Sequence, residues 1–177
     1  MSLFSVETYS QKIIQVKKTD KYSYEVSCTI NFNNDVSSKL IEFCWNMDNV
    51  SKLLAKEPVT IIYTGNELMQ FVSYDYKFLF FHYYSKYIRE KSVTNGKISF
   101  KLIKNNCNIP FIPNIINGYG EYTFTSNKNT TTMHYTQYSK CEGEVPDFYL
   151  EYIKSDIEKY FNKFEAEANK AIYNANN

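Results

Sequence analysis

The chain has 177 residues, 44% hydrophobic and 18% aromatic, with 20 basic and 19 acidic residues and a formal net charge of +1. This length is most simply one domain, 1–177, and is enough to bury about 70% of the unfolded surface. The balanced charge, with no basic stripe, argues against a nucleic-acid partner.

Residues 1–20 mix charged and β-branched side chains without a clear period. We expect them to be peripheral, either as an edge strand or as a segment lying loosely on the surface. They show no basic stretch followed by an apolar one, so no signal peptide is predicted. The most apolar later stretch, Leu79–Tyr84, is far shorter than the roughly 20 residues that span a bilayer, so we expect no stable membrane insertion.

The clearest periodic pattern runs from Tyr22 to Phe32. Every odd-numbered residue inside this segment is polar, and the even-numbered ones are apolar or aromatic: Tyr22, Tyr24, Val26, Cys28, Ile30 and Phe32. Strict alternation predicts a strand with one buried face and one wet face.

Two short helices are predicted after this strand. Asn34 or Asp35 can cap the first, which would run to about Asn46. The second would cover Val50–Lys56, because Pro58 cannot continue it.

Six further strands follow in the prediction. Asn95-Gly96 between two β-rich runs is the strongest hairpin signal of the chain. The boundary between two of these strands, near Asp75, stays open. The predicted strands are Val59–Tyr63, Leu68–Tyr76, Phe78–Arg89, Lys97–Ile103, Gly118–Thr125 and Thr131–Tyr138.

One long amphipathic helix closes the chain. Pro146 suits its first turn, and Asp147 places an acid where the helix dipole favours one. Its apolar residues recur at three- and four-residue steps over about 27 residues, or about 40 Å. So long an apolar stripe must lie across the sheet, and 174–177 remain as a tail. The stripe comprises Tyr149, Ile153, Ile157, Tyr160, Phe161, Phe164 and Ala168.

Three segments carry a family resemblance. The first strand runs into a helix with Trp45 and then Asp48, the segment NGYGEYTFTSNKNTTTMHYTQY looks like a penultimate hairpin, and the last helix starts at a proline. This order, from about Tyr22 to Ala171, resembles the helix-grip fold of the SRPBCC superfamily. That superfamily includes START lipid-transfer domains, polyketide cyclase/dehydrase-like proteins and the birch-pollen-allergen group.

The resemblance implies an α+β fold, with a curved antiparallel sheet of about seven strands around the long C-terminal helix. Between them it implies an apolar cavity, since members bind lipids, sterols, polyketide intermediates or plant hormones. The superfamily has no universal catalytic motif to transfer. The glycine-rich loop of some members is reduced here to Gly65, which argues against a nucleotide or phosphate role at that loop.

Three functions follow as hypotheses. The first is binding of a small hydrophobic ligand, such as a lipid, a sterol or a polyketide-like molecule. The second is a polyketide cyclase/aromatase-like enzyme, so whether the protein is an enzyme stays open. The third is an interaction protein that uses an aromatic outer strand face. No cofactor is expected.

The candidate ligand-binding residues are chosen by the face of the strand on which they lie, because residues two apart in a strand share a face. On Phe78–Arg89 both faces are rich in aromatics, so either a subunit partner covers the outer face, as in a homodimer, or its tyrosines are exposed. His82 and Tyr84 could act as acid–base groups, although a strand histidine bonded to a neighbour is the commoner case. The predicted cavity lining is Phe78, Phe80, His82, Tyr84, Tyr122, Phe124, Tyr135, Ile153, Ile157 and Phe161.

The connection Asn106–Asn117 is unusually apolar for a loop, and its two prolines prevent regular structure. One interpretation is a loop folded onto the core. The other is a lid at the cavity mouth, formed by Phe111, Ile115 and Ile116.

The cysteines Cys28, Cys44, Cys107 and Cys141 lie far apart, with no metal-binding spacing. We read them as reduced thiols of a cytoplasmic protein. Only two histidines are present, and neither belongs to a cluster suited to zinc, so no metal site is expected.

Overall fold

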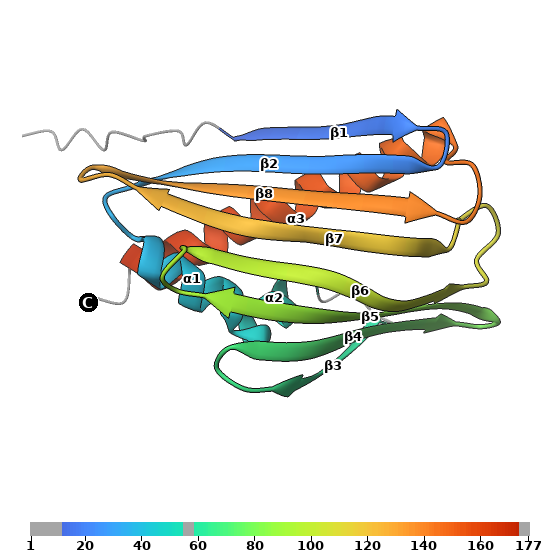
Figure 1. Ribbon diagram of the computed structural model, residues 1–177, viewed down its shortest axis with the longest axis horizontal. Helices are drawn as coiled ribbons and strands as arrows, with labels where there is room; N and C mark the ends of the chain where they lie inside the picture. The colour runs from blue at the N-terminus through green and yellow to red at the C-terminus, as the bar shows by residue number, and fades with distance from the viewer. Residues whose placement is uncertain (1–11, 55–58, 174–177) are drawn as a thin grey trace, which may run out of the picture.

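The computed structural model describes residues 12–54 and 59–173. It contains an eight-stranded antiparallel sheet, two short helices and one long helix (Figure 1). The predicted helix-grip fold is confirmed, with one strand more than expected. The elements are β1 (Ile13–Asp20), β2 (Ser23–Asn33), α1 (Ser37–Trp45), α2 (Met47–Leu54), β3 (Val59–Gly65), β4 (Met69–Phe78), β5 (Phe81–Ser92), β6 (Lys97–Cys107), β7 (Ile115–Ser126), β8 (Thr130–Cys141) and α3 (Asp147–Tyr173).

The additional strand is β1, which lies at one edge of the sheet. The strand order is β1-β2-β8-β7-β6-β5-β4-β3. The early strand β2 therefore pairs with the last strand, β8, and β3 forms the edge opposite β1. Ile14 and Val16 pack against the core from β1, while the residues between them face solvent. This alternation was hidden in the sequence by the charged residues around it.

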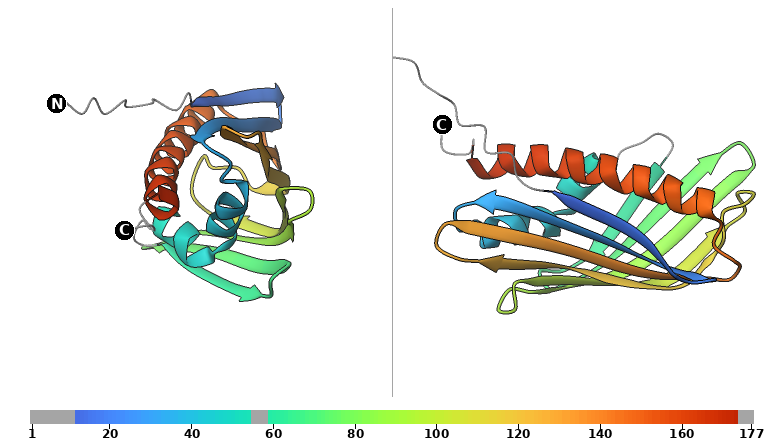
Figure 2. Two further views of the ribbon diagram at one scale, coloured as in Figure 1. Left: turned by 90° about the vertical axis from the view of Figure 1, so that its left-hand side faces the viewer. Right: turned by 90° about the horizontal axis from the view of Figure 1, so that it is seen from above.

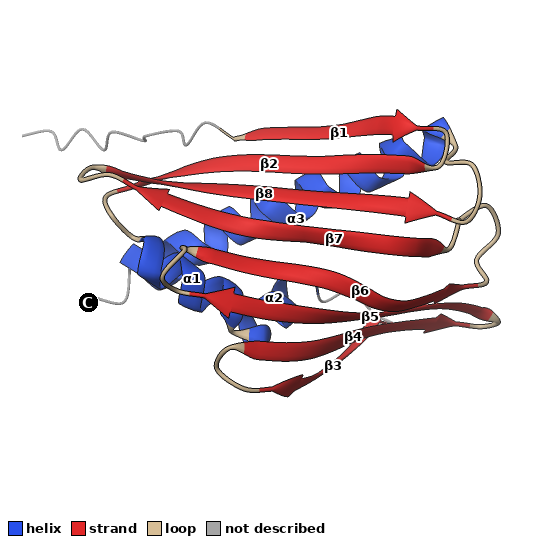
Figure 3. Ribbon diagram, viewed as in Figure 1, coloured by secondary structure: helices blue, strands red, loops and turns tan. Residues whose placement is uncertain are grey.

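The long helix α3 lies along the concave face of the curved sheet, and α1 and α2 fill one end between helix and sheet (Figure 2). Figure 3 distinguishes the helices from the strands by colour. The predicted amphipathic stripe explains this packing, because Phe161 and Phe164 are fully buried against the sheet side. The helix extends over 27 residues, as its periodicity indicated.

The main core lies between α3, α1 and the half of the sheet that contains β2, β7 and β8. The even-numbered side chains of β2, from Tyr24 to Phe32, are all buried there. The predicted buried and wet faces are confirmed from Tyr24 to Phe32, but at the start of the segment Tyr22 is exposed and Ser23 is buried.

The turn between β4 and β5 falls where the sequence shows no turn residues. Phe78 pairs with Phe81, so Leu79 and Phe80 form a two-residue turn. Leu79 adopts φ of 54°, a left-handed conformation that glycine or asparagine usually occupies. The aromatic run that sequence analysis treated as a single strand is thus split between two strands.

Candidate functional site

A cavity of about 830 Å³ lies between α3 and the inner face of β3–β6. Side chains from β7, β8, α2 and the β6–β7 loop complete its walls. This volume falls within the roughly 300–1,000 Å³ of typical small-molecule sites. The cavity forms because α3 lies nearer to β1 and β2 than to the opposite edge of the sheet.

Tyrosines dominate the walls of the cavity. They come from β4, β5, β7, β8 and α3. Because they are scattered along the chain, no local sequence motif indicates that they line one cavity. Tyr122 and Tyr160 face each other with hydroxyl oxygens 3.3 Å apart, and Tyr135 donates a hydrogen bond to Gln137. The lining tyrosines are Tyr74, Tyr76, Tyr83, Tyr87, Tyr122, Tyr135, Tyr149, Tyr152 and Tyr160.

The phenols of the cavity are held in their neutral form. Burial raises the pKa of Tyr74, Tyr83 and Tyr87 above the ordinary value of 10.0. Burial likewise raises the pKa of Tyr122 and Tyr135 well above it. A neutral phenol both donates and accepts a hydrogen bond, so the cavity can bind a ligand that carries carbonyl or hydroxyl oxygens.

Three cations line the cavity, of which Arg89 is buried, whereas Lys159 and Lys163 on α3 are exposed. Arg89 is 6% exposed, and its guanidinium donates to the Cys44 carbonyl at 2.6 Å and to Gln70 Oε1 at 2.9 Å. It also lies over the ring of Trp45, 5.3 Å from the centroid. Among residues 12–54 and 59–173, Arg89 forms no ion pair with a carboxylate. A buried guanidinium without an anionic partner favours a ligand that brings negative charge.

Part of the predicted lining is in place. Tyr122, Tyr135 and Ile157 face the cavity. Phe161 and Phe124 are buried core residues instead, and Ile153 packs half-buried against that core. Phe161 supports the cavity indirectly, because its ring contacts that of Tyr135 at 5.1 Å between centroids.

The predicted lining residues of the β4–β5 hairpin do not face the cavity. Phe78 and Phe80 lie at the exposed tip, while His82 bonds Asp75 at 2.7 Å and Tyr84 bonds Ser73 at 3.3 Å on the outer face. The predicted face was wrong because the two-residue turn at Leu79 and Phe80 shifts the alternation, so that odd-numbered residues form the inner side of β5. It carries Tyr83, Ser85, Tyr87 and Arg89.

The mouth assignment also needs correction. Ile115 is a buried core residue at the start of β7, and Ile116 points to the opposite side, 58% exposed. Phe111 projects into solvent. The loop does reach the cavity, but through Ile109 and Ile112.

Alternation around Arg89 shows which residues of β5 share a face, but not that this face is the inner one. Tyr83, Ser85 and Tyr87 precede Arg89 at two-residue steps, so the four residues share one face of β5. A face with tyrosines, a serine and an arginine resembles a wet surface in sequence, and only the cover of α3 makes it internal.

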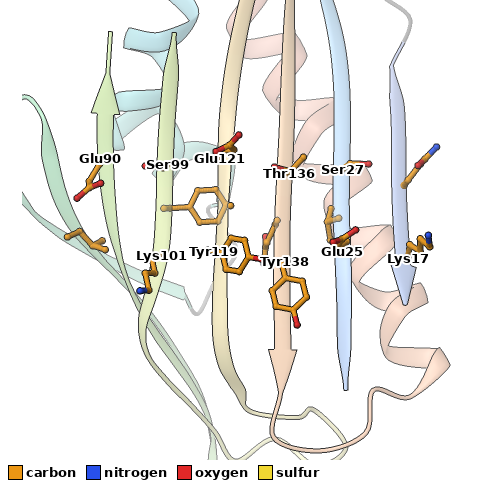
Figure 4. A pocket seen from close by; sticks show the side chains of 16 residues that line it. Lys17, Glu25, Ser27, Glu90, Ser99, Lys101, Tyr119, Glu121, Thr136 and Tyr138 are labelled. Atoms are coloured by element: carbon orange, nitrogen blue, oxygen red, sulfur yellow. The ribbon is translucent and has the colours of Figure 1, made fainter. Parts of the chain in front are cut away.

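A second hollow, of about 660 Å³, lies on the outer face of the sheet, away from α3 (Figure 4). It is lined by charged and hydroxyl side chains of both halves of the sheet. Tyr119 and Tyr138 contact each other there with ring centroids 5.2 Å apart. Glu121 at its rim pairs with Lys97. The inner cavity is larger than this hollow and is lined mainly by aromatic and aliphatic side chains, so it is the candidate site.

Three further observations concern other kinds of site. In the part of the chain that the structure describes, no group of three or more His, Cys, Asp or Glu side chains is placed to hold a metal ion. No helix within 12–54 or 59–173 is long and apolar enough to cross a membrane. All four cysteines are free.

No protein-family model matches the chain, and no curated protein matches its sequence. Solved structures do. The Zhui aromatase/cyclase from Streptomyces sp. R1128 matches over 88% of this chain and 99% of its own, with a TM-score of 0.65 at 13% identity. The ginseng major latex-like protein 151 from Panax ginseng covers 83% and 98%, with a TM-score of 0.55 at 10% identity.

A third match is the di-domain ARO/CYC StfQ from the steffimycin biosynthetic pathway, with a TM-score of 0.60 at 12% identity. It covers 85% of this chain but 52% of its own, so the likeness spans about half of that protein. At such identities the likeness concerns the fold alone, and it is the helix-grip fold that sequence analysis expected.

Proposed function

We propose that the protein binds a small, largely hydrophobic ligand in the cavity between α3 and the sheet. The observation that carries the proposal is the cavity itself, about 830 Å³ in volume and lined mainly by aromatic and aliphatic side chains. Similar folds in a major latex-like protein and in aromatase/cyclases support a pocket at this place.

The chemistry of the walls narrows the ligand class. Neutral phenols distributed around the cavity favour a ligand with several oxygen atoms over a plain alkyl chain, because each buried hydroxyl needs a hydrogen-bond partner. The guanidinium of Arg89 favours a carboxylate, enolate or phenolate at one end. An oxygenated aromatic or polyketide-like acid satisfies both features, whereas a sterol satisfies only the apolar part.

A dye titration tests binding. An anilinonaphthalene-sulfonate probe should gain fluorescence with the wild-type protein. Ile157→Trp places a large ring into the cavity from α3 and should weaken this binding at least about tenfold. Glu158→Trp, on the exposed side of the same helix, is the matched control and should bind as the wild type does. Equal affinities for all three proteins would reject the cavity as the site.

A second test identifies the natural ligand. Native mass spectrometry of protein purified from its own source should show an added mass that unfolding releases. Release of a compound lacking an acidic group would contradict the role given to Arg89.

The alternative function is a cyclase-like enzyme, and Arg89 is the observation that favours it. An enolate oxygen formed during an intramolecular aldol condensation could be stabilised by this cation, while a neutral phenol such as Tyr122 donates to a carbonyl oxygen. Incubation with a poly-β-keto thioester should then yield a cyclised aromatic product, detected by its absorbance and mass. Arg89→Lys should lower that yield more than it lowers probe binding. Tight binding of the thioester without conversion would favour the binding protein.

The interaction hypothesis loses much of its basis. Tyr83 and Tyr87 lie inside the cavity, so the outer face of β5 is left with His82, Tyr84 and charged residues. We therefore do not retain the aromatic outer face as the main functional surface.

A further inference from the structure

One end of the molecule carries the most exposed large apolar side chains of the described residues. Leu79 and Phe80 form the β4–β5 turn, with 81% and 74% of their surface exposed, and Phe111 in the β6–β7 loop is 82% exposed. We call these three residues the apolar tips. Both segments project at the same end of the sheet, the right-hand end in Figure 1.

The two segments are held together by one side chain. Asn108 accepts a hydrogen bond from the His82 amide at 2.6 Å and donates to the Phe80 carbonyl at 3.0 Å. Its own amide donates to the His82 carbonyl at 3.0 Å. The tips are therefore presented as one unit.

The backbone at the tips is strained for the residues that occupy it. Leu79 has φ of 54° and Phe111 has φ of 66°. Left-handed backbone costs about 1 kcal/mol for such residues, and asparagine or glycine would relieve it. Exposed hydrophobic side chains at positions that fold better without them indicate a function outside the fold.

The loop that carries Phe111 also lines the cavity. Its neighbours Ile109 and Ile112 point inward, and Tyr76 and Tyr83 reach the cavity from the hairpin that carries the other two tips. The apolar tips thus lie on two segments that also contribute side chains to the cavity wall.

The exposed apolar area and the charge around the tips indicate which kind of partner they suit. Three side chains of this size expose on the order of 400 Å², about half of what each partner contributes to a standard protein interface. Two lysines at this end are neutralised locally, since Lys77 pairs with Asp75 at 2.9 Å and Lys21 with Glu144 at 3.1 Å. Separate, uncharged apolar points suit insertion into lipid better than a flat protein partner or an anionic polymer.

We propose that the apolar tips dock this end of the domain reversibly on the surface of a lipid bilayer. The inference rests on the proposed function for its purpose, because docking at this end brings part of the cavity wall to the membrane, from which an apolar ligand can enter with little exposure to water. No membrane-spanning element is required, since the tips reach only the interfacial layer.

Flotation of the full chain with phosphatidylcholine vesicles tests the proposal. The wild type should float with the vesicles. The double variant Leu79→Asn/Phe111→Asn should partition on the order of tenfold less, because it loses two apolar anchors. Its thermal stability should stay equal or rise, because asparagine accepts the left-handed backbone.

The matched control lies at the opposite end of the sheet. Leu68 and Val93 are 61% and 57% exposed there, outside the left-handed region. Leu68→Asn/Val93→Asn removes comparable apolar surface and should leave flotation unchanged. Added phosphatidylserine or salt should alter wild-type binding less than about threefold, since the lysines are paired.

Several outcomes would overturn the docking. Absence of wild-type flotation, or equal flotation of the tip variant, contradicts it directly. A wild-type dimer that the tip variant converts to a monomer, without vesicle binding, would assign the tips to a second copy of the chain. Probe binding to the cavity in solution should be the same for the wild type and the tip variant. Loss of that binding in the wild type would instead count against the proposed function.

Discussion

The two halves of the sheet face the same helix but differ in what lies between. Along β2 the inner side chains, such as Val26, Ile30 and Phe32, are buried in the main core that α3 also joins. Around β4 and β5 the inner side chains are tyrosines and Arg89, and α3 stands away from them. One half therefore supplies stability, and the other supplies the cavity.

The largest effect should come from a charge in the packed half. Ile115→Asp buries an unpaired carboxylate and should cost about 4 kcal/mol or more, or prevent folding. The adjacent Ile116→Asp, on the exposed side of β7, should change the free energy of unfolding by no more than about 0.5 kcal/mol. Urea denaturation of both variants checks this, and similar stabilities would show that Ile115 belongs to a cavity mouth after all.

Removal of a ring from α3 should be nearly as severe. Phe161→Ala should cost about 3–5 kcal/mol, because the fully buried ring packs against Tyr135 and Phe164. Ile157→Ala, four residues earlier and facing the cavity, should cost less than about 1.5 kcal/mol, since much of its surroundings is already empty. Equal losses in denaturant unfolding would mean that both halves are packed alike.

Alkaline pH should affect the cavity half selectively. Burial raises the pKa of Tyr87 and Tyr122 in the folded state, whereas the unfolded chain ionises near 10. The folded state then holds more protons above pH 10, so its stability is intact below that pH and falls as the pH rises further. Unfolding curves at pH 8 and 10.5, with phenolate absorbance at 295 nm, measure both effects. Phenolate formation near pH 10 in a fully folded protein would contradict the burial.

The smallest effects concern thiol reactivity. Burial raises the pKa of Cys28 and Cys44 to about 12 and that of Cys141 to about 11, so these thiols should react slowly in the native protein. The half-exposed Cys107 should react first with a thiol reagent. Denatured protein without reductant should titrate as four thiols, in keeping with the proposed cytoplasmic location. A count of two would contradict it.

The order and type of the elements could be read from the sequence because local signals carried them. The alternation of β2, the Asn95-Gly96 hairpin and the stripe of α3 each express a repeating contact with one surface, which leaves a periodic trace in the chain. The fold class followed from that order. An edge strand such as β1 was one of the two alternatives for residues 1–20. Its charged residues obscured the alternation that would have favoured pairing with β2.

Only the tertiary structure decided which aromatic face became the cavity. The β4–β5 turn at Leu79 and Phe80 contains no typical turn residues. The sequence therefore did not show where the inward-facing positions change from even-numbered to odd-numbered residues. Whether Tyr83 or Tyr84 is internal depends on that turn and on where α3 crosses the sheet. An inner wall of tyrosines, serine and arginine has the composition of a solvated surface. It becomes a binding cavity because a helix that begins more than 50 residues later in the sequence covers it, which no local pattern records.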